Sequence, residues 1–180
     1  MVEPSSRPLT PLEVRVADAV DVDGLVDAAA RLVRIPSWNG YETPAQELMV
    51  HLMEEAGLEV DSWSIDLQAV AQHPAHAAEI ARDKALGVVG TLPGAGRGRS
   101  LILNAHVDVV PPGDEALWSH PPFGGVVQNG RLYGRGALDL KGPLAAGLHA
   151  LIAVRRAGVP LAGPVHLMSV VGEEDLSLIH

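Results

Sequence analysis

An imidazole and a carboxylate stand two residues apart at the point where a short apolar run ends. Leu101, Ile102 and Leu103 are typical of a buried strand, and His106 and Asp108 follow them. Because alternate side chains of an extended segment lie on the same face, both polar side chains can point into one pocket. A pair at this spacing is also common in an ordinary hydrogen-bonded turn. His106 and Asp108 alone therefore leave a structural turn, a metal site and a catalytic site open.

Two later acidic segments favour the metal site. Asp139 lies in a glycine-rich loop before a predicted helix, and the adjacent Glu173 and Glu174 follow a predicted strand. In α/β proteins, sites form where the carboxyl ends of strands and the loops after them converge. Four carboxylates around one imidazole would repel one another unless a cation offset their charge. A divalent metal ion is the natural cation, and imidazole with carboxylate but no sulfur suits zinc, cobalt or manganese.

Such a set of residues can hydrolyse a bond with water. A carboxylate between two metal ions about 3.5–4 Å apart can bridge them and hold a hydroxide. A neighbouring carboxylate that is not a ligand can accept the proton from that water. Successive side chains at a strand end diverge, so one of Glu173 and Glu174 can bind metal while the other faces the substrate.

The elements that must position these residues follow from apolar periodicity and from capping residues. Asp21 or Asp23 can cap a helix that ends near Arg34, and Thr43-Pro44 can start a second helix that Gly57 ends. A third helix is expected over residues 143–156. The expected strands are residues 58–65, 86–92, 101–103 and 165–171, with a hairpin over residues 126–133 around an Asn-Gly turn. Together they predict an α/β fold with a layered sheet flanked by helices.

Three other segments are expected to carry no site. Residues 1–17 look like a flexible leader, and residues 66–85 look like an exposed, alanine-rich excursion with a short helix. That excursion holds a weak alternative metal group, which its surroundings disfavour: His73, His76 and Glu79. Residues 93–99 are rich in glycine, but neither a helix nor Gly-Lys-Ser/Thr follows, so a hairpin loop is favoured over a phosphate cradle.

The composition limits the classes of partner and compartment. The 180 residues carry a formal net charge of -9, which argues against nonspecific binding to nucleic acid. The lack of cysteine excludes disulfides, thiolate zinc sites and cysteine nucleophiles, and it is compatible with a reducing compartment. The sequence has no apolar run of about 18 residues and no visible signal peptide. We therefore expect a cytoplasmic protein without nucleic-acid or membrane partners.

Three segments carry a resemblance to a known family. Residues 104–111, 133–142 and 172–175 resemble the three motifs of the aminoacylase and acetylornithine deacetylase/succinyl-diaminopimelate desuccinylase metallopeptidases, which include carboxypeptidase G-like enzymes. Their order and spacing are also similar, since Asp139 follows His106 by 33 residues and Glu173 follows Asp139 by 34. The resemblance covers residues 21–175. It implies a zinc-exopeptidase-like catalytic domain, of which this sequence is the N-terminal part.

The resemblance also implies a role for each polar residue. His106 would bind one zinc ion, Asp139 would bridge two, and Glu174 would bind the other, with cobalt or manganese as possible substitutes. Glu173 would be the general base, and Asp108 would orient His106 without binding metal itself. Members of the family hydrolyse amide bonds of N-acyl amino acids or small peptides. The full-length protein would form a homodimer through a further domain.

The sequence departs from the family pattern after Glu174. Family members are considerably longer and carry an inserted lid or dimerisation domain, a further acidic ligand and a late histidine ligand, none of which matches here. The expected organisation is a leader over 1–17, the N-terminal part of a metallohydrolase domain over 18–175, and a non-native tail over 176–180. That tail reads like a translated sequencing adapter. We expect such a truncated chain to bind metal weakly, to be nearly inactive alone, and to expose an apolar sheet edge.

A second class of function stays open. The fold could serve as a non-catalytic binding module or a pseudoenzyme that has lost its chemistry. The presence of His106, Asp139, Glu173 and Glu174 together favours a metal-dependent amide hydrolase instead. A dehydrogenase is disfavoured because no Gly-x-Gly-x-x-Gly follows a predicted strand.

Overall fold

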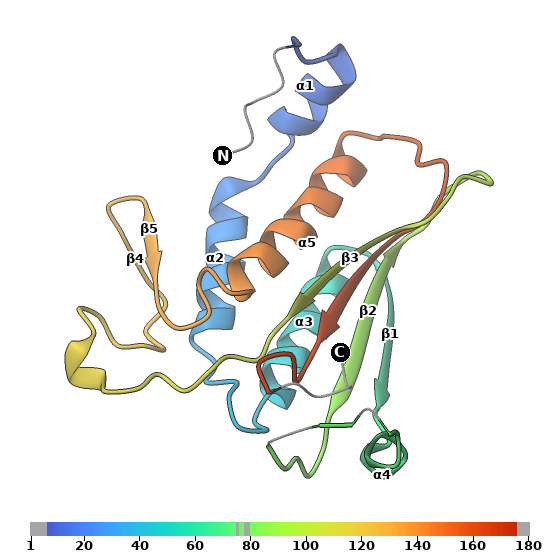
Figure 1. Cartoon of the computed structure of the whole chain (residues 1–180). Helices are drawn as coiled ribbons and strands as arrows, with labels where there is room; N and C mark the ends of the chain where they lie inside the picture. The colour runs from blue at the N-terminus through green and yellow to red at the C-terminus, as the bar shows by residue number, and fades with distance from the viewer. Residues whose placement is uncertain (1–6, 75, 78–79, 176–180) are drawn as a thin grey trace.

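A computed structural model describes residues 7–74, 76–77 and 80–175, and a four-stranded sheet lies at its centre (Figure 1). The strands lie in the order β1, β2, β6, β3. Their bounds are β1 Glu59–Ser64, β2 Leu86–Leu92, β3 Leu101–His106 and β6 Val165–Val170. The β1–β2 and β2–β6 pairs are antiparallel, whereas β3 and β6 are parallel. Strands β1, β2 and β6 lie within predicted ranges, whereas β3 runs three residues past the predicted 101–103 and includes His106.

Three long helices pack on one face of this sheet (Figure 1): α2 Val22–Val33, α3 Thr43–Glu55 and α5 Lys141–Arg156. Their apolar stripes meet the sheet in one core, where Leu32, Met49 and Leu148 are buried against Val88 and Leu167. Alternation along β2 and β6 directs these strand residues toward the helices. The predicted α/β fold with a sheet flanked by helices is thereby confirmed.

The helix starts differ from the predictions in detail. The side chain of Asp21 caps α2 by accepting from Gly24 N at 2.9 Å, as predicted. The predicted cap of α3 is wrong, because Thr43 is already helical and Glu42 at the cap position makes no side-chain cap bond. The Glu42 carboxylate is occupied elsewhere, by Arg82 and by Gly40 N. Helix α5 begins at Lys141, two residues before the predicted start.

Residues 11–17, which the sequence suggested as part of a leader, lie in α1, which spans Pro11–Asp18. A capping box holds its first turn: Thr10 N donates to Glu13 Oε2 at 2.8 Å, and Glu13 N donates to Thr10 Oγ1 at 3.3 Å. No residue of α1 is buried, so this helix contributes no side chain to the buried core. Residues 1–6 and the predicted tail at 176–180 lie outside the described residues.

The smaller elements follow the sequence closely. Strands β4 Val126–Gln128 and β5 Arg131–Tyr133 form the predicted hairpin, and Asn129 and Gly130 in its turn have φ of 51° and 71°. The excursion after β1 contains the expected short helix, α4 Leu67–Ala71. A single turn, η1 Glu115–Leu117, lies in the loop after β3. Within the described residues, no helix is both long and apolar enough to cross a membrane.

The pairing of β3 with β6 decides where the polar segments lie. His106 is opposite Val170, so both strands end at the same edge of the sheet, and the segments after them leave side by side. Strand β3 is one of the two edge strands of this sheet, and Leu101 and Ile102 are 53% and 56% exposed. Apolar side chains are therefore exposed along this edge.

Two close contacts fix α3 on the sheet. Gly90 lets the helix approach β2, because a Cβ there would lie 2.7 Å from Met53 Sδ. The buried Gln46 amide donates to the carbonyl oxygens of Leu86 at 2.9 Å and Ser169 at 2.8 Å, and it accepts from the Ser169 hydroxyl. The helix is thus bonded to both central strands at once.

We predict that Gln46→Leu lowers the free energy of unfolding by about 2–4 kcal/mol, because two buried carbonyls and a hydroxyl lose their partner. The measurement is urea denaturation followed by circular dichroism. Gln68→Leu, the same substitution at an exposed position of α4, is the matched control and should leave stability nearly unchanged. Equal stability of the two variants would contradict the structural role of Gln46.

Candidate metal centre

Side chains from three loops converge at the carboxyl ends of β3 and β6. Ligand atoms of His106, Asp139 and Glu174 all lie within 4.8 Å of one another. His106 Nε2 is 3.1 Å from Asp139 Oδ1 and 3.7 Å from Glu173 Oε2. The three polar segments singled out in the sequence therefore meet at one place, although they are more than 30 residues apart in the chain.

The hydrogen bond at the other ring nitrogen sets the tautomer of His106. Its Nδ1 lies 2.9 Å from the carbonyl oxygen of Asp108. Because a carbonyl only accepts, Nδ1 carries a proton, and Nε2 is the ring nitrogen that faces Asp139 and Glu173. Without a metal ion, only a protonated Nε2 can donate to Asp139, whereas a divalent ion can be held by the neutral ring and the carboxylates together. These residues therefore fit a divalent metal bound at Nε2, with the nitrogen and oxygen donors that zinc, cobalt or manganese accept.

Asp108 lies beneath the imidazole and contacts two of the other segments. Its main-chain carbonyl holds His106, whereas its carboxylate Oδ1 is 3.7 Å from His106 Nδ1, beyond hydrogen-bond distance. Carboxylate Oδ2 accepts from Glu174 N at 2.8 Å. Burial raises the pKa of Asp108, and the hydrogen bond from Glu174 N acts in the opposite direction. The orienting contact that the sequence predicts for Asp108 is thus made by its backbone, and its side chain positions Glu174.

The carboxylates differ in their exposure. The side chain of Asp108 is 3% exposed, whereas those of Asp139 and Glu173 are 72% and 51% exposed. Glu174 is half-buried, and burial raises its pKa, with His106 opposing and the charges of Asp139, Asp108 and Glu173 adding to the shift. A bound cation would remove this penalty, which is a further sign that the donor set suits a metal.

Hydrogen bonds to residues 35–37 hold the loops in place. Ser37 Oγ donates to the carbonyl of Val107 at 2.6 Å, and Val109 N donates to the carbonyl of Ser37 at 3.0 Å. Lys141 Nζ, from the start of α5, donates to the carbonyl of Ile35 at 2.7 Å. The segment after α2 therefore braces both the segment after β3 and the loop that carries Asp139.

The motif residue Lys141 is fully buried, which the sequence did not reveal. Burial lowers its pKa from 10.5 to about 7, against the opposing charge of Asp108. In the sequence, only its position in the Asp-Leu-Lys-Gly stretch could have pointed to the burial of Lys141, and a lysine near a helix start is more often exposed. Its partner, the Ile35 carbonyl, is 106 residues away and leaves no local pattern.

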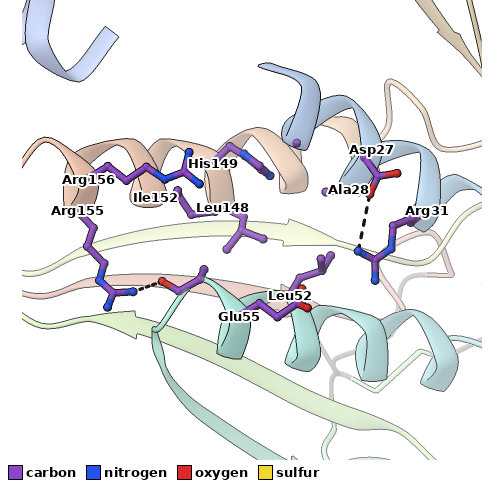
Figure 2. Close-up of a pocket in the computed structure, with 12 residues that line it drawn as sticks. Asp27, Ala28, Arg31, Leu52, Glu55, Leu148, His149, Ile152, Arg155 and Arg156 are labelled. Carbon is purple, nitrogen blue, oxygen red and sulfur yellow. Dashed lines mark hydrogen bonds and ion pairs between the residues drawn. The ribbon is translucent and has the colours of Figure 1, made fainter. Parts of the chain in front are cut away.

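Two cavities of the described residues bear on the location of the site. One of about 180 Å³ lies against the cluster and is lined in part by Asp108 and Glu174. Another of about 500 Å³ lies between α2, α3 and α5, where Figure 2 shows Arg31 paired with Asp27 and Arg155 bonded toward α3. The residues lining this larger cavity include none of the cluster, so the predicted chemistry does not lie there.

The weak metal alternative in the excursion stays disfavoured. Among residues 7–74, 76–77 and 80–175, the metal-compatible group is that of His106, Asp139 and Glu174, and neither His73 nor His76 belongs to it. Glu79, the third member of that alternative, lies outside the described residues.

Comparison with known sequences identifies one family. Residues 102–178 match the profile of Peptidase family M20/M25/M40. The chain is similar to a succinyl-diaminopimelate desuccinylase of Xanthobacter autotrophicus, with 36% identity over 147 residues that cover 82% of this chain and 34% of the relative. It is also similar to an N-formyl-4-amino-5-aminomethyl-2-methylpyrimidine deformylase of Bacillus subtilis, with 34% identity over 145 residues, covering 74% and 30%. The chain thus spans about a third of the length of these curated relatives.

Comparison with solved structures supports the fold. Human carnosine dipeptidase 1 superimposes with a TM-score of 0.72 at 23% identity, over 96% of this chain and 37% of that one. At this identity the likeness concerns the arrangement of helices and strands. It agrees with the layered sheet described above.

We predict that Lys141 makes the stability of the metal-free protein depend on pH. Between pH 7 and 10.5 the unfolded chain keeps a proton on this lysine that the folded chain has released. The free energy of unfolding should therefore rise with pH from about 7 to 10.5, by up to about 1.4 kcal/mol per pH unit. The same stability is lost when the pH is lowered back to 7. Urea denaturation in EDTA measures this slope.

Two variants isolate the contribution of Lys141. Lys141→Met should flatten the slope, whereas Lys84→Met, at an exposed lysine, should keep it. A Lys141→Met profile parallel to that of the wild type would show that the buried amine does not titrate in this range.

Proposed function

The chain belongs to Peptidase family M20/M25/M40, and on this premise we propose that it carries the metal-binding part of an amide hydrolase. The observation that carries the proposal is the convergence of His106, Asp139 and Glu174 within 4.8 Å. Nε2 of His106 faces the carboxylates of this group while Nδ1 is held by a carbonyl, an arrangement that suits a metal ligand. Because the chain spans about a third of its curated relatives, the activity of the whole protein is part of the proposal.

We assign two divalent ions, most simply zinc, to this cluster. His106 would hold one ion through Nε2, Glu174 would hold the other, and Asp139 would be a ligand of both. Asp108 binds neither ion, but fixes the His106 ring through its carbonyl and the Glu174 backbone through its carboxylate. These roles follow the family resemblance, and the hydrogen bonds around the cluster support them.

The proposed reaction is hydrolysis of an amide. Two divalent ions held by His106, Asp139 and Glu174 would supply Lewis acidity for this reaction. Glu173 serves as the general base: its half-exposed carboxylate accepts a proton from water and later gives it to the departing amine. The largely exposed carboxylate of Asp139 lies at Nε2 of His106, on the same solvent-facing side as Glu173. The open side of the cluster is therefore the side where a substrate approaches.

The substrate class proposed is an N-acyl amino acid or a small peptide. The two curated relatives are named for removing succinyl and formyl groups, and the solved structure is named as a dipeptidase. What these names share is a small molecule with an acyl–nitrogen bond. We propose no nucleic-acid or membrane partner, a homodimeric full-length protein, and the cytoplasm as its compartment, which the cysteine-free sequence favours.

A polypeptide of these 180 residues is expected to bind zinc weakly and to turn over slowly by itself. His106, Asp139 and Glu174 provide only part of the ligand set that the family resemblance implies for two ions. The alternative of a non-catalytic binding module would share the fold and the metal but not the turnover. Metal binding and hydrolysis therefore have to be measured separately.

We predict that His106→Ala and Glu173→Ala separate metal binding from chemistry. His106→Ala should weaken zinc binding by at least about tenfold, because a direct ligand is lost. Glu173→Ala should retain zinc, and should lower hydrolysis by about 10²–10⁴-fold in any form of the protein that cleaves an N-succinyl amino acid. Zinc titration calorimetry and ninhydrin detection of the released amine give the two readouts.

The matched control is His51→Ala. His51 is an exposed histidine that lies 3.1 Å from Glu55, so it is a surface imidazole–carboxylate pair without the rest of the cluster. Its loss should change neither readout. Equal loss of zinc in the His106 and Glu173 variants would contradict the separate roles assigned to them.

A further inference from the structure

A buried arginine joins two segments that are far apart in the sequence. The Arg82 side chain is 3% exposed, and it lies in the connection between α4 and β2. Its Nη1 is 2.6 Å from Asp175 Oδ2, while its Nη2 and Nε lie 3.0 Å and 3.3 Å from the two carboxylate oxygens of Glu42. The carboxylates of Glu42 and Asp175 are 3% and 9% exposed. The three side chains therefore form a buried ion triad.

One end of the triad is the turn that carries the two site glutamates. Asp175 follows Glu174 directly, and its Oδ1 has no hydrogen-bond partner within the described part of the chain. Arg82 is the side chain that donates to the Asp175 carboxylate. On the other side of the same turn, Glu174 N donates to Asp108 at 2.8 Å. The main chain at Glu174 is held between these two contacts.

The other end of the triad is a firm support. Glu42 precedes α3 and also accepts from Gly40 N at 3.1 Å. Gly40 lies against the arginine segment, since a Cβ there would be 3.0 Å from the Ala81 carbonyl and 3.3 Å from Arg82 Cγ, and its φ is +88°. Arg82 is therefore fixed by the start of a core helix and reaches from it to the glutamate turn.

The position of this triad points to a purpose beyond stability. A buried ion triad adds little stability compared with apolar side chains of the same size, but it enforces one geometry. Arg82 and Asp175 line the cavity of about 180 Å³ that Asp108 and Glu174 also line. Arg82 therefore acts on the proposed metal cluster indirectly, because it pairs with Asp175, the residue next to the proposed ligand Glu174.

We infer that Arg82 is a positioning residue that fixes the 172–175 turn through Asp175, so that the Glu174 carboxylate is aimed at the metal. The inference rests on the proposed metal site. The inference also predicts the direction in which zinc affinity changes when Arg82 is removed. A purely electrostatic effect of Arg82 would repel a cation, so removing it would tighten metal binding. Loss of a positioning residue weakens binding instead.

The test measures zinc affinity by titration calorimetry, and the melting temperature in EDTA, for the 180-residue protein and its variants. Arg82→Met should weaken zinc binding by about tenfold, as is typical for the residues that orient metal ligands. Arg82→Lys keeps the charge but loses the two-armed geometry, so it should also weaken binding. If Arg82→Met does not fold, Arg82→Lys decides the question.

Two control variants separate positioning from general stability. Gln46→Leu removes buried hydrogen bonds between α3 and the sheet without touching Arg82 or the glutamate turn, so it should lower the melting temperature while zinc affinity stays unchanged. Arg156→Met removes an exposed arginine that pairs with Asp21 at 3.3 Å, and it should change neither readout. If Arg82→Met binds zinc as tightly as the wild type or more tightly, the inference is overturned and the metal site stands. If the wild type binds no zinc, the proposed site and this inference fall together.

Discussion

His106 Nδ1 donates to the carbonyl of Asp108, so Nε2 is the ring nitrogen that faces the acidic side chains. Much of the surrounding structure follows from that constraint. Asp108 is buried below the ring, Glu174 is half-buried beside it, and burial raises the pKa of both carboxyl groups. Gathering this much negative charge around one imidazole is costly in the absence of a cation. With a divalent ion between them, the same groups become favourable donors.

The fold meets this constraint by bracing the site loops from outside. The parallel pairing of β3 and β6 brings two of them to one sheet edge, and the start of α5 brings the third. Residues 35–42, between α2 and α3, then contact all three. Ser37 holds the segment after β3, Ile35 accepts from Lys141 at the start of α5, and Arg82 connects the same stretch to the turn after β6. A connection that carries no metal ligand therefore determines the geometry of the ligands.

The sequence predicted the elements whose patterns are local. Strands β1, β2, β3 and β6, the Asn-Gly hairpin and helices α2, α3 and α5 all follow from apolar periodicity and turn residues. The sequence could single out the proposed site residues because His106 and Glu174 lie at or just after the ends of strands and Asp139 precedes a helix. Helix α1 was missed although Thr10, Pro11 and Glu13 form a pattern typical of a helix start. The buried polar residues could not be predicted, because Gln46, Arg82 and Lys141 have partners up to 123, 93 and 106 residues away.

The most direct test of a metal-binding site at this sheet edge is anomalous diffraction from a crystal grown with zinc, recorded on both sides of the zinc absorption edge. Our account predicts an anomalous peak bonded to His106 Nε2 and to carboxylate oxygens of Asp139 or Glu174, with the Nδ1 bond to Asp108 kept. A crystal without a peak there, with His106 Nε2 still directly against Asp139, would contradict it. So would zinc bound at a surface pair such as His51 and Glu55 with the cluster empty.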